Sequence, residues 1–434
     1  MASVLLTSLP VQGHLGPVVA VAADLVRRGH RVRVLTGAAY RDRVERAGAD
    51  FLELPAHAYA GDLDHPERRP GSSGPQALGH DLETRFVRYI GPQFAAVEAA
   101  LADEPADVLI TELLFMGAYP LIVREDRPRV LLLGISPLPV EGGGTAPYGL
   151  GLAPGRGPLV RMRNAALKQL IDRWVFASPQ RLLVEEFRRL TGRVPATSMF
   201  DAPLTMDAVL QLGPPGLEYP RPGLPLTVRF VGPLPTPAAH LPLPEWWDDL
   251  DDGRPVVHVT QGTVANGDFA RLLVPAVRAL AERPVLVVLT AGGRPEAELR
   301  EALGEVPDNV RTASFLDYST FLPKVSALVT NGGYGTVTQA LAHGVPLVVA
   351  GRTEDKAEVA ARVAWSGAGI DLRTDHPSPR RIDDAVGRVL GEPRFRRAAA
   401  RLRDEIAVAG GLDAVDELVR SSSARSPDTA TTEF

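Results

Sequence analysis

A histidine lies in the turn between a strand-like run and a helix-like run, where general-base chemistry is possible. His14 is flanked by Gly13 and Gly16. In open parallel sheets, ligands bind beyond the carboxyl ends of the strands, where such turns lie. A histidine there can deprotonate a hydroxyl if a carboxylate orients it; the simpler alternative is a helix-capping role. Of two carboxylates flanking one strand, Asp107 and Glu112, only Glu112 is at the carboxyl end, so we favour it as the partner.

A second chemical feature is the glycine-rich stretch "TNGGYGTVTQALAHGVP". Gly332, Gly333 and Gly335 follow the strand-like run Ala327–Thr330 and precede a helix expected to start near Thr336. Backbone N–H groups at a helix N-terminus attract phosphate, and glycines let an anion approach without clashing with Cβ atoms. The alternative is a tight turn with no ligand.

Two further glycine turns favour the phosphate interpretation. "TQGT", which contains Gly262 and Thr263, and "AGGR" each follow a strand-like run in the same half of the chain. The glycine spacing of "NGGYGT" does not fit the dinucleotide-binding fingerprint, and no Gly-Lys-Ser/Thr follows it as in a P-loop. The pattern therefore predicts a phosphate site of another type.

Acids and aromatics near these turns have two possible roles. Glu354 and Asp355, in "GRTEDK", can accept hydrogen bonds from a polyol, or they can simply occupy a solvated helix N-terminus. No histidine lies nearby to suggest a metal. Phe315 and Tyr318 precede the glycine-rich stretch and can stack on a base, or can belong to the core.

The elements that must position these residues alternate between strand and helix. The start of the chain reads as strand, turn, helix, strand, with Pro17 expected in the first helical turn. This order predicts a parallel sheet. The rhythm continues through strand-like runs at 107–112 and 130–135, and it restarts in "PVVHVTQG", "RPVLVVLTAGG", "SALVTNGG" and "VPLVVAG". A helical stretch begins after residue 160.

A proline-dense segment divides the chain, because prolines there favour a stiff extended linker. Loops rich in proline, glycine and serine are expected at 60–80 and 141–160, where long loops are often functional. We expect two doubly wound α/β domains facing across a cleft. The first domain is expected at 1–214 and the second at 245–400, with the linker at 215–244 between them. We expect a C-terminal helix at 401–420 to pack back towards the first domain, followed by a disordered tail at 421–434.

The composition excludes several classes of function. The 434 residues have a net charge of −5, which gives no indication of a nucleic-acid or membrane-surface partner. No run of about 18 apolar residues is present, so no membrane span is expected. The apolar run Val4-Leu5-Leu6 is short and no basic residue precedes it, so no secretory signal is expected. The absence of cysteine excludes disulfides and cysteine metal sites, and it fits a cytoplasmic location.

Three long stretches together resemble one family. They are "GHLGPVVAVAADLVRRGHRVRVLT", "FLDYSTFLPKVSALVTNGGYGTVTQALAHGVPLVV" and "EDKAEVAARVAWSGAGIDL". With the spacing between them, the sequence resembles the inverting nucleotide-sugar glycosyltransferases of the GT-B fold. These form the UDP-glycosyltransferase-like superfamily, and the chain looks most similar to the branch of bacterial macrolide transferases.

The resemblance implies that the first domain binds a small hydrophobic acceptor and that the second binds a UDP- or dTDP-sugar. His14 matches the catalytic base, and Glu112 falls where the family has the orienting aspartate. No cofactor or metal is implied. The sequence gives no indication of oligomeric state, sugar or acceptor.

The resemblance also assigns donor contacts. Gly333, Gly335 and Thr336 match the diphosphate loop, with Gly262 and Thr263 nearby. Asp355, next to Glu354, matches the acid that contacts sugar hydroxyls. Several positions depart from the family: Asn331 replaces a phosphate-binding histidine, Phe315 a stacking tryptophan, Tyr318 a glutamine, Gln339 the ribose-binding glutamate and Lys356 a glutamine.

These departures keep two other functions open. One is a non-catalytic GT-B helper that activates a partner transferase, and the other is a nucleotide-sugar epimerase of the same fold. The intact His14 and Asp355 argue against the helper, and the long loops at 60–80 and 141–160 suggest an acceptor pocket that an epimerase does not need.

Overall fold

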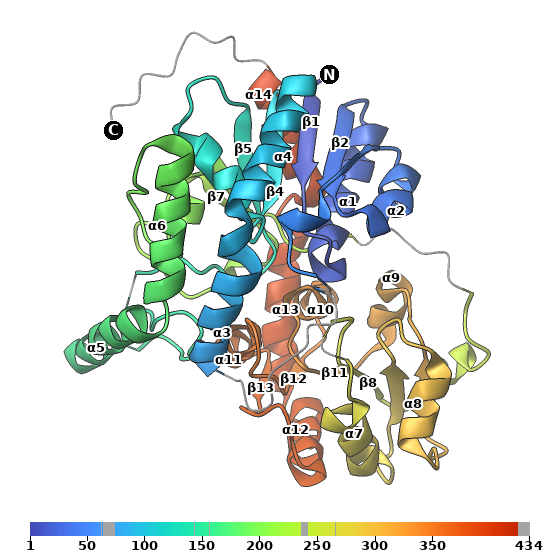
Figure 1. Cartoon of the computed structure of the whole chain (residues 1–434). Coiled ribbons are helices and arrows are strands. Elements are labelled where there is room, and N and C mark those ends of the chain that lie inside the picture. The colour runs from blue at the N-terminus through green and yellow to red at the C-terminus, as the bar shows by residue number, and fades with distance from the viewer. Residues whose placement is uncertain are drawn as a thin grey trace.

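Two α/β domains lie one above the other in the structure, a computed structural model that describes residues 1–61, 63, 74–142, 144–155, 157–235, 242–264 and 266–423 (Figure 1). Each is built on a parallel sheet with helices on both faces. This confirms the predicted doubly wound architecture.

The first sheet has seven strands in the order β3-β2-β1-β4-β5-β6-β7, and all pairings are parallel. The strands are β1 (Ser3–Thr7), β2 (Arg31–Thr36), β3 (Asp50–Glu53), β4 (Val108–Glu112), β5 (Arg129–Gly134), β6 (Ala208–Gln211) and β7 (Val228–Phe230). Its helices are α1 (Gln12–Arg27), α2 (Arg41–Arg46), α3 (Gly74–Asp81), α4 (Ile90–Asp103), α5 (Pro158–Trp174) and α6 (Ala177–Thr191).

The second sheet has six strands in the order β10-β9-β8-β11-β12-β13, again parallel. They are β8 (Val256–Thr260), β9 (Leu286–Thr290), β10 (Val310–Ala313), β11 (Ala327–Thr330), β12 (Leu347–Val349) and β13 (Gly369–Asp371). The helices are α7 (Leu273–Leu280), α8 (Glu296–Leu303), α9 (Tyr318–Phe321), α10 (Tyr334–Ala342), α11 (Lys356–Ser366), α12 (Pro379–Gly391), α13 (Pro393–Ala407) and α14 (Gly411–Ser423).

Apolar runs make the central strands because both faces of each sheet are covered. Strands β4, β8, β9 and β11 are buried along their whole length, as expected for parallel strands between two helix layers. In both sheets the strand order reverses at the centre, between β1 and β4 and between β8 and β11. Ligands bind at such switch points.

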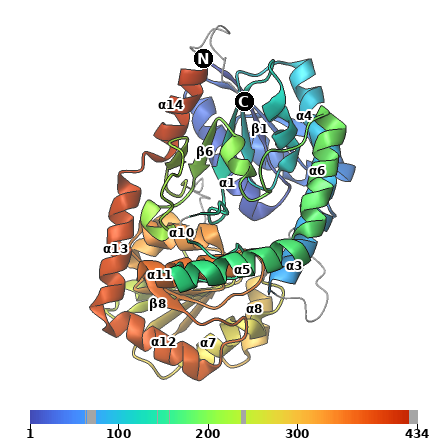
Figure 2. The same ribbon diagram turned by 90° about the vertical axis from the view of Figure 1, so that its left-hand side faces the viewer.

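The chain returns to the first domain at its C-terminal end. Helices α13 and α14 run along one side of the molecule from the second domain to the first (Figure 2). Asp416 of α14 meets the ring of His30, with Nε2 to Oδ1 at 2.8 Å. The expected tail lies outside the described residues, except that 421–423 form the last turn of α14. No described helix has both the length and the apolar character to cross a membrane.

Three local expectations differ from the structure. Helix α1 begins at Gln12 rather than near Pro17, because the Val11 carbonyl accepts from the N–H groups of His14 and Leu15. The expected loop at 60–80 contains the start of α3. The expected linker 215–244 is not free throughout, since β7 pairs with β6 as the last strand of the first sheet.

Candidate active site

A cavity of about 330 Å³ opens between the two domains at both switch points. The first domain contributes mostly apolar side chains: Val11, Leu63, Leu78, Leu82, Phe86, Leu113, Leu114, Met116, Tyr119, Tyr148, Met199 and Phe200, together with His14, Asp81 and Arg85. The second domain contributes the glycine turns and a group of polar residues: Gln261, Gly262, Thr263, Asn331, Gly333, Tyr334, Gly335, Thr336, Glu354, Asp355 and Lys356.

His14 and Glu112 meet at this cavity as the sequence predicts. His14 lies in the first turn of α1, after β1, and Glu112 is the last residue of the adjacent strand β4. The distance from His14 Nδ1 to Glu112 Oε1 is 3.1 Å. The histidine side chain is 20% exposed, whereas the glutamate is fully buried. The extra methylene of glutamate, relative to aspartate, therefore does not prevent contact.

The backbone holds Glu112 in place. Leu9 N–H donates to Oε1 at 3.3 Å, and Leu114 N–H donates to Oε2 at 2.6 Å. An ionised carboxylate only accepts hydrogen bonds, so the Nδ1 that faces it carries the proton. This tautomer makes Nε2 of His14 the basic nitrogen.

The glycine-rich stretch faces the cavity as a helix N-terminus. Gly333 is the N-cap of α10 and supplies no side-chain cap to the first helical N–H groups. A Cβ at Gly335 would have no neighbour within 4 Å, so the approach there is open. Gly332 is needed for the turn itself. Its φ is +90°, and a Cβ there would lie 2.7 Å from Val349 Cγ1. The stretch thus combines a sharp turn with an open approach.

Asn331 lies between two glycine turns of the second domain, the one that contains Gly262 and the one that contains Gly333. It is 9% exposed, and its Nδ2 donates to the carbonyl of Gln261. This bond joins the end of β11 to the end of β8. Because Nδ2 carries two hydrogens, the engagement with Gln261 leaves one more donor on the same amide.

Three charged residues come together where β12 leads into α11. Glu354 has a φ of +56°, which is uncommon outside glycine, and its carboxylate pairs with the ammonium group of Lys356. Burial raises the pKa of Asp355 to about 6; Lys356 opposes this shift and Glu354 adds to it. His14 also lowers this pKa, and both side chains line the same cavity from opposite domains.

Three predicted donor contacts do not line the cavity. Phe315 is 42% exposed outside it. The hydroxyl of Tyr318 bonds to Nε2 of the buried His258 at 2.9 Å. The amide of Gln339 donates to the carbonyl of Leu234 at 2.7 Å. The structure brings the remaining predicted residues together.

Comparison with known proteins decides the family. The model of the family "Erythromycin biosynthesis protein CIII-like, C-terminal domain" matches residues 285–415. The 4'-demethylrebeccamycin synthase of Lentzea aerocolonigenes is 46% identical over 423 residues, 96% of this chain and 98% of that protein. The chain belongs to the UDP-glycosyltransferase-like glycosyltransferases.

Other relatives agree with this assignment. UDP-glycosyltransferase 2 of Phaeomoniella chlamydospora is 34% identical over 438 residues, 96% of this chain and 95% of that protein. The crystal structure of the glycotransferase of kitacinnamycin has a TM-score of 0.71 at 21% identity, covering 97% of this chain and 98% of that chain. The fold is therefore GT-B, and the protein is a glycosyltransferase enzyme rather than a helper or an epimerase.

Sequence reasoning missed most of the apolar wall of this glycosyltransferase. Leu78, Leu82 and Phe86 recur every four residues across α3 and the π-helical turn Leu82–Phe86, and this spacing was an available signal. Tyr148 and Phe200 had no such signal, because they come from separate irregular segments that meet only in the folded chain, with ring centroids 5.7 Å apart.

Proposed function

We propose that this glycosyltransferase moves a sugar from a nucleoside diphosphate to a hydroxyl of a hydrophobic natural product, with inversion at the anomeric carbon. One observation carries the proposal: the His14–Glu112 pair lies on one wall of the cavity, and the uncapped N-terminus of α10 lies on the other. A base and an anion site across one cavity are what displacement of a diphosphate requires.

The apolar wall supports a hydrophobic acceptor. Its leucine and phenylalanine side chains have no group that can hydrogen-bond a sugar or a peptide, but they gain about 25 cal/mol per Å² of apolar surface that they cover. The name 4'-demethylrebeccamycin synthase, carried by a relative at 46% identity, supports a natural-product acceptor.

The second-domain wall supports a nucleotide-sugar donor. The diphosphate would accept from the first N–H groups of α10, near Gly335 and Thr336, at the positive end of the helix. Asp355 and Glu354 would accept from sugar hydroxyls. The name UDP-glycosyltransferase 2 of a relative is consistent with this donor class.

In the proposed step, Nε2 of His14 takes the proton of the acceptor hydroxyl as its oxygen bonds to the anomeric carbon. The bond from that carbon to the phosphate oxygen breaks, and its electron pair leaves with the nucleoside diphosphate. Attack from the face opposite the leaving group inverts the configuration. Glu112 stabilises the imidazolium that forms, and the N–H groups of α10 stabilise the developing diphosphate charge.

The test is a product assay. The protein is incubated with UDP- and dTDP-linked α-sugars and a panel of hydrophobic hydroxylated aglycones, and products are identified by mass spectrometry and NMR. We expect a β-glycoside. An α-glycoside from an α-linked donor would contradict inversion, and sugar transfer to no aglycone in the panel would count against the acceptor class. Activity is expected to survive EDTA, and a metal requirement would contradict the assignment of charge stabilisation to α10.

A further inference from the structure

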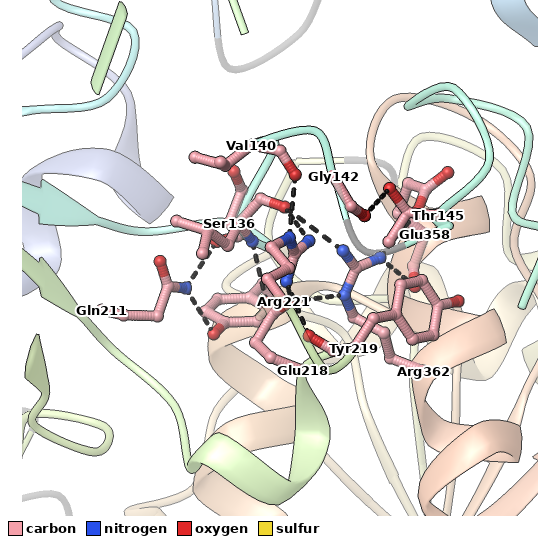
Figure 3. Close-up of polar contacts among 12 residues, drawn as sticks. Ser136, Val140, Gly142, Thr145, Gln211, Glu218, Tyr219, Arg221, Glu358 and Arg362 are labelled. Carbon is pink, nitrogen blue, oxygen red and sulfur yellow. Dashed lines mark hydrogen bonds and ion pairs between the residues drawn. The ribbon is translucent and has the colours of Figure 1, made fainter. Parts of the chain in front are cut away.

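Two carboxylates and two guanidinium groups are buried together behind the cavity wall. Glu218 and Arg221 belong to the segment after β6, and Glu358 and Arg362 belong to α11 of the second domain. None of the four side chains is more than 5% exposed. We call these four residues the interdomain network, and Figure 3 shows them converging beside Ser136 and Val140.

Most partners of the network are in one loop of the first domain. This loop, termed the β5 loop, comprises the described residues 136–142 and 144–151. Glu218 Oε1 accepts from Leu138 N–H at 2.8 Å, and the Leu138 carbonyl accepts from Arg221 at 2.9 Å and from Arg362 at 3.3 Å. Near its start, the β5 loop is therefore bonded to the second domain through Arg362.

The far end of the loop is bonded to α11 by Glu358. Its Oε1 accepts from Gly149 N–H at 2.9 Å and from Gly151 N–H at 2.8 Å, while its Oε2 accepts from Arg362 at 2.6 Å. The packing there is close, because a Cβ at Gly151 would lie 2.6 Å from the carbonyl of Ala357 in α11.

The segments that the network joins both reach the cavity. Tyr148, one residue before Gly149, lines the apolar wall, and Asp355, three residues before Glu358, lines the polar wall. The β5 loop is part of the first domain by sequence, and its Glu141 pairs with Lys168 of α5. Its bonds at Leu138, Gly149 and Gly151, in contrast, go to α11 and to the segment after β6.

We propose that Glu358 is a positioning residue for sugar transfer. It fixes the β5 loop on α11 and thereby keeps the distance between Tyr148, on the acceptor side, and Asp355, on the donor side, constant. This inference rests on the proposed function, in which these two residues face acceptor and sugar. Replacing Glu358 with another acid of shorter reach would keep the charge beside Arg362 and release the loop.

The first test needs no substrate. Hydrogen exchange of peptides covering 144–151 is compared between the wild type, Glu358→Asp and the control Glu301→Asp, an exposed glutamate of α8. We expect exchange in this segment to accelerate at least tenfold in Glu358→Asp alone. Unchanged exchange would overturn the inference, whatever the enzyme transfers.

The second test separates positioning from stability. For an aglycone that the wild type glycosylates, we expect Glu358→Asp to raise the acceptor KM at least tenfold with nucleotide Kd within twofold. A lowered Tm with unchanged acceptor KM would mean a structural role only and would overturn the inference. If the wild type itself transfers nothing, the proposed function fails, and the exchange comparison alone decides the contact.

A variant on the loop side tests the same contact without altering charge. Gly151→Ala places a methyl group against α11 at a φ of +60°, whereas Gly192→Ala introduces similar left-handed strain at +71° with no neighbour within 4 Å. We expect only Gly151→Ala to reproduce the exchange and KM changes of Glu358→Asp. Equal behaviour of the two alanine variants would count against the inference.

Discussion

The two walls of the cavity are built by different means from the same kind of fold. Both lie at the switch point of a parallel doubly wound sheet. The second-domain wall consists of glycine turns, a helix N-terminus without a side-chain cap and polar side chains, so backbone N–H groups take part in it. The first-domain wall consists of large apolar side chains from α3, the β5 loop and the segment near Phe200. Backbone recognition suits a donor with a fixed diphosphate, whereas side-chain packing suits an acceptor that varies.

If this comparison holds, damage to one wall should leave binding at the other intact. His14 is the strictest case, because the proposed mechanism places it on the first-domain wall as the base for the hydroxyl that attacks the donor. We expect His14→Ala to lower kcat by about 10²–10⁴-fold, with nucleotide Kd unchanged by isothermal titration calorimetry. His57→Ala, an exposed histidine outside the cavity, is the control. Equal turnover by His14→Ala would remove it from the base role.

The second-domain wall contains a buried acid that destabilises the folded protein when it is ionised. Burial raises the folded pKa of Asp355 to about 6, above the usual value for an aspartate. The carboxyl group of Asp355 therefore binds its proton more tightly in the folded state than in the unfolded state. Proton binding to Asp355 stabilises the fold at low pH, and this stabilisation is lost as pH rises from about 4 to about 6. We expect Asp355→Asn to increase the unfolding free energy by on the order of 2 kcal/mol at pH 8 and hardly at pH 4.

Urea denaturation at both pH values measures this difference. Asp308→Asn, on an exposed turn of the same domain, should change neither value. A stabilisation by Asp355→Asn that is the same at pH 4 and pH 8 would show that ionisation of the carboxyl group is not its source.

A charge at Asn331, beside the proposed diphosphate site, should affect the second-domain wall alone. Asn331→Asp removes the amide donor and adds a negative charge beside the α10 N-terminus. We expect nucleotide Kd to rise about 10- to 100-fold, since a charged hydrogen bond contributes roughly 1.5–3 kcal/mol. Asn331→His keeps a hydrogen-bond donor at this position, so nucleotide binding should be retained. A larger loss in Asn331→His than in Asn331→Asp would indicate that Asn331 has a role other than donating to the nucleotide.

The smallest effect is expected on the acceptor wall, where many side chains share the contact. Phe86→Ala should raise the acceptor KM about fivefold, because partial loss of one apolar contact costs about 1 kcal/mol, and nucleotide Kd should not change. Leu159→Ala, on the outer face of α5 and 79% exposed, is the control. A change in nucleotide Kd in Phe86→Ala would show that the two walls are coupled through this residue.

Local pattern predicted the parts of the site that depend on strand ends. His14, Glu112 and the glycine-rich stretch each follow or end a strand, and adjacent parallel strands bring such positions together. Gln339 is assigned by resemblance alone, and for Phe315 and Tyr318 the position in the sequence allows either base stacking or a place in the core. The structure engages Tyr318 with His258 and Gln339 with Leu234, contacts that no local pattern encodes.

The sequence by itself determined the two parallel sheets and the chemistry placed at their strand ends, because strand–helix alternation and glycine turns act over a few residues. Only the tertiary structure decided how the halves meet. The bonds from Glu358 to Gly149 and Gly151 join residues 209 and 207 positions apart. In the interdomain network, the ion pair between Arg362 and Glu218 joins the two domains, whereas Arg221–Glu218 and Arg362–Glu358 are local pairs. Burial and pairing at such separations depend on the whole packed molecule, since each charge is stable there only with all its partners present.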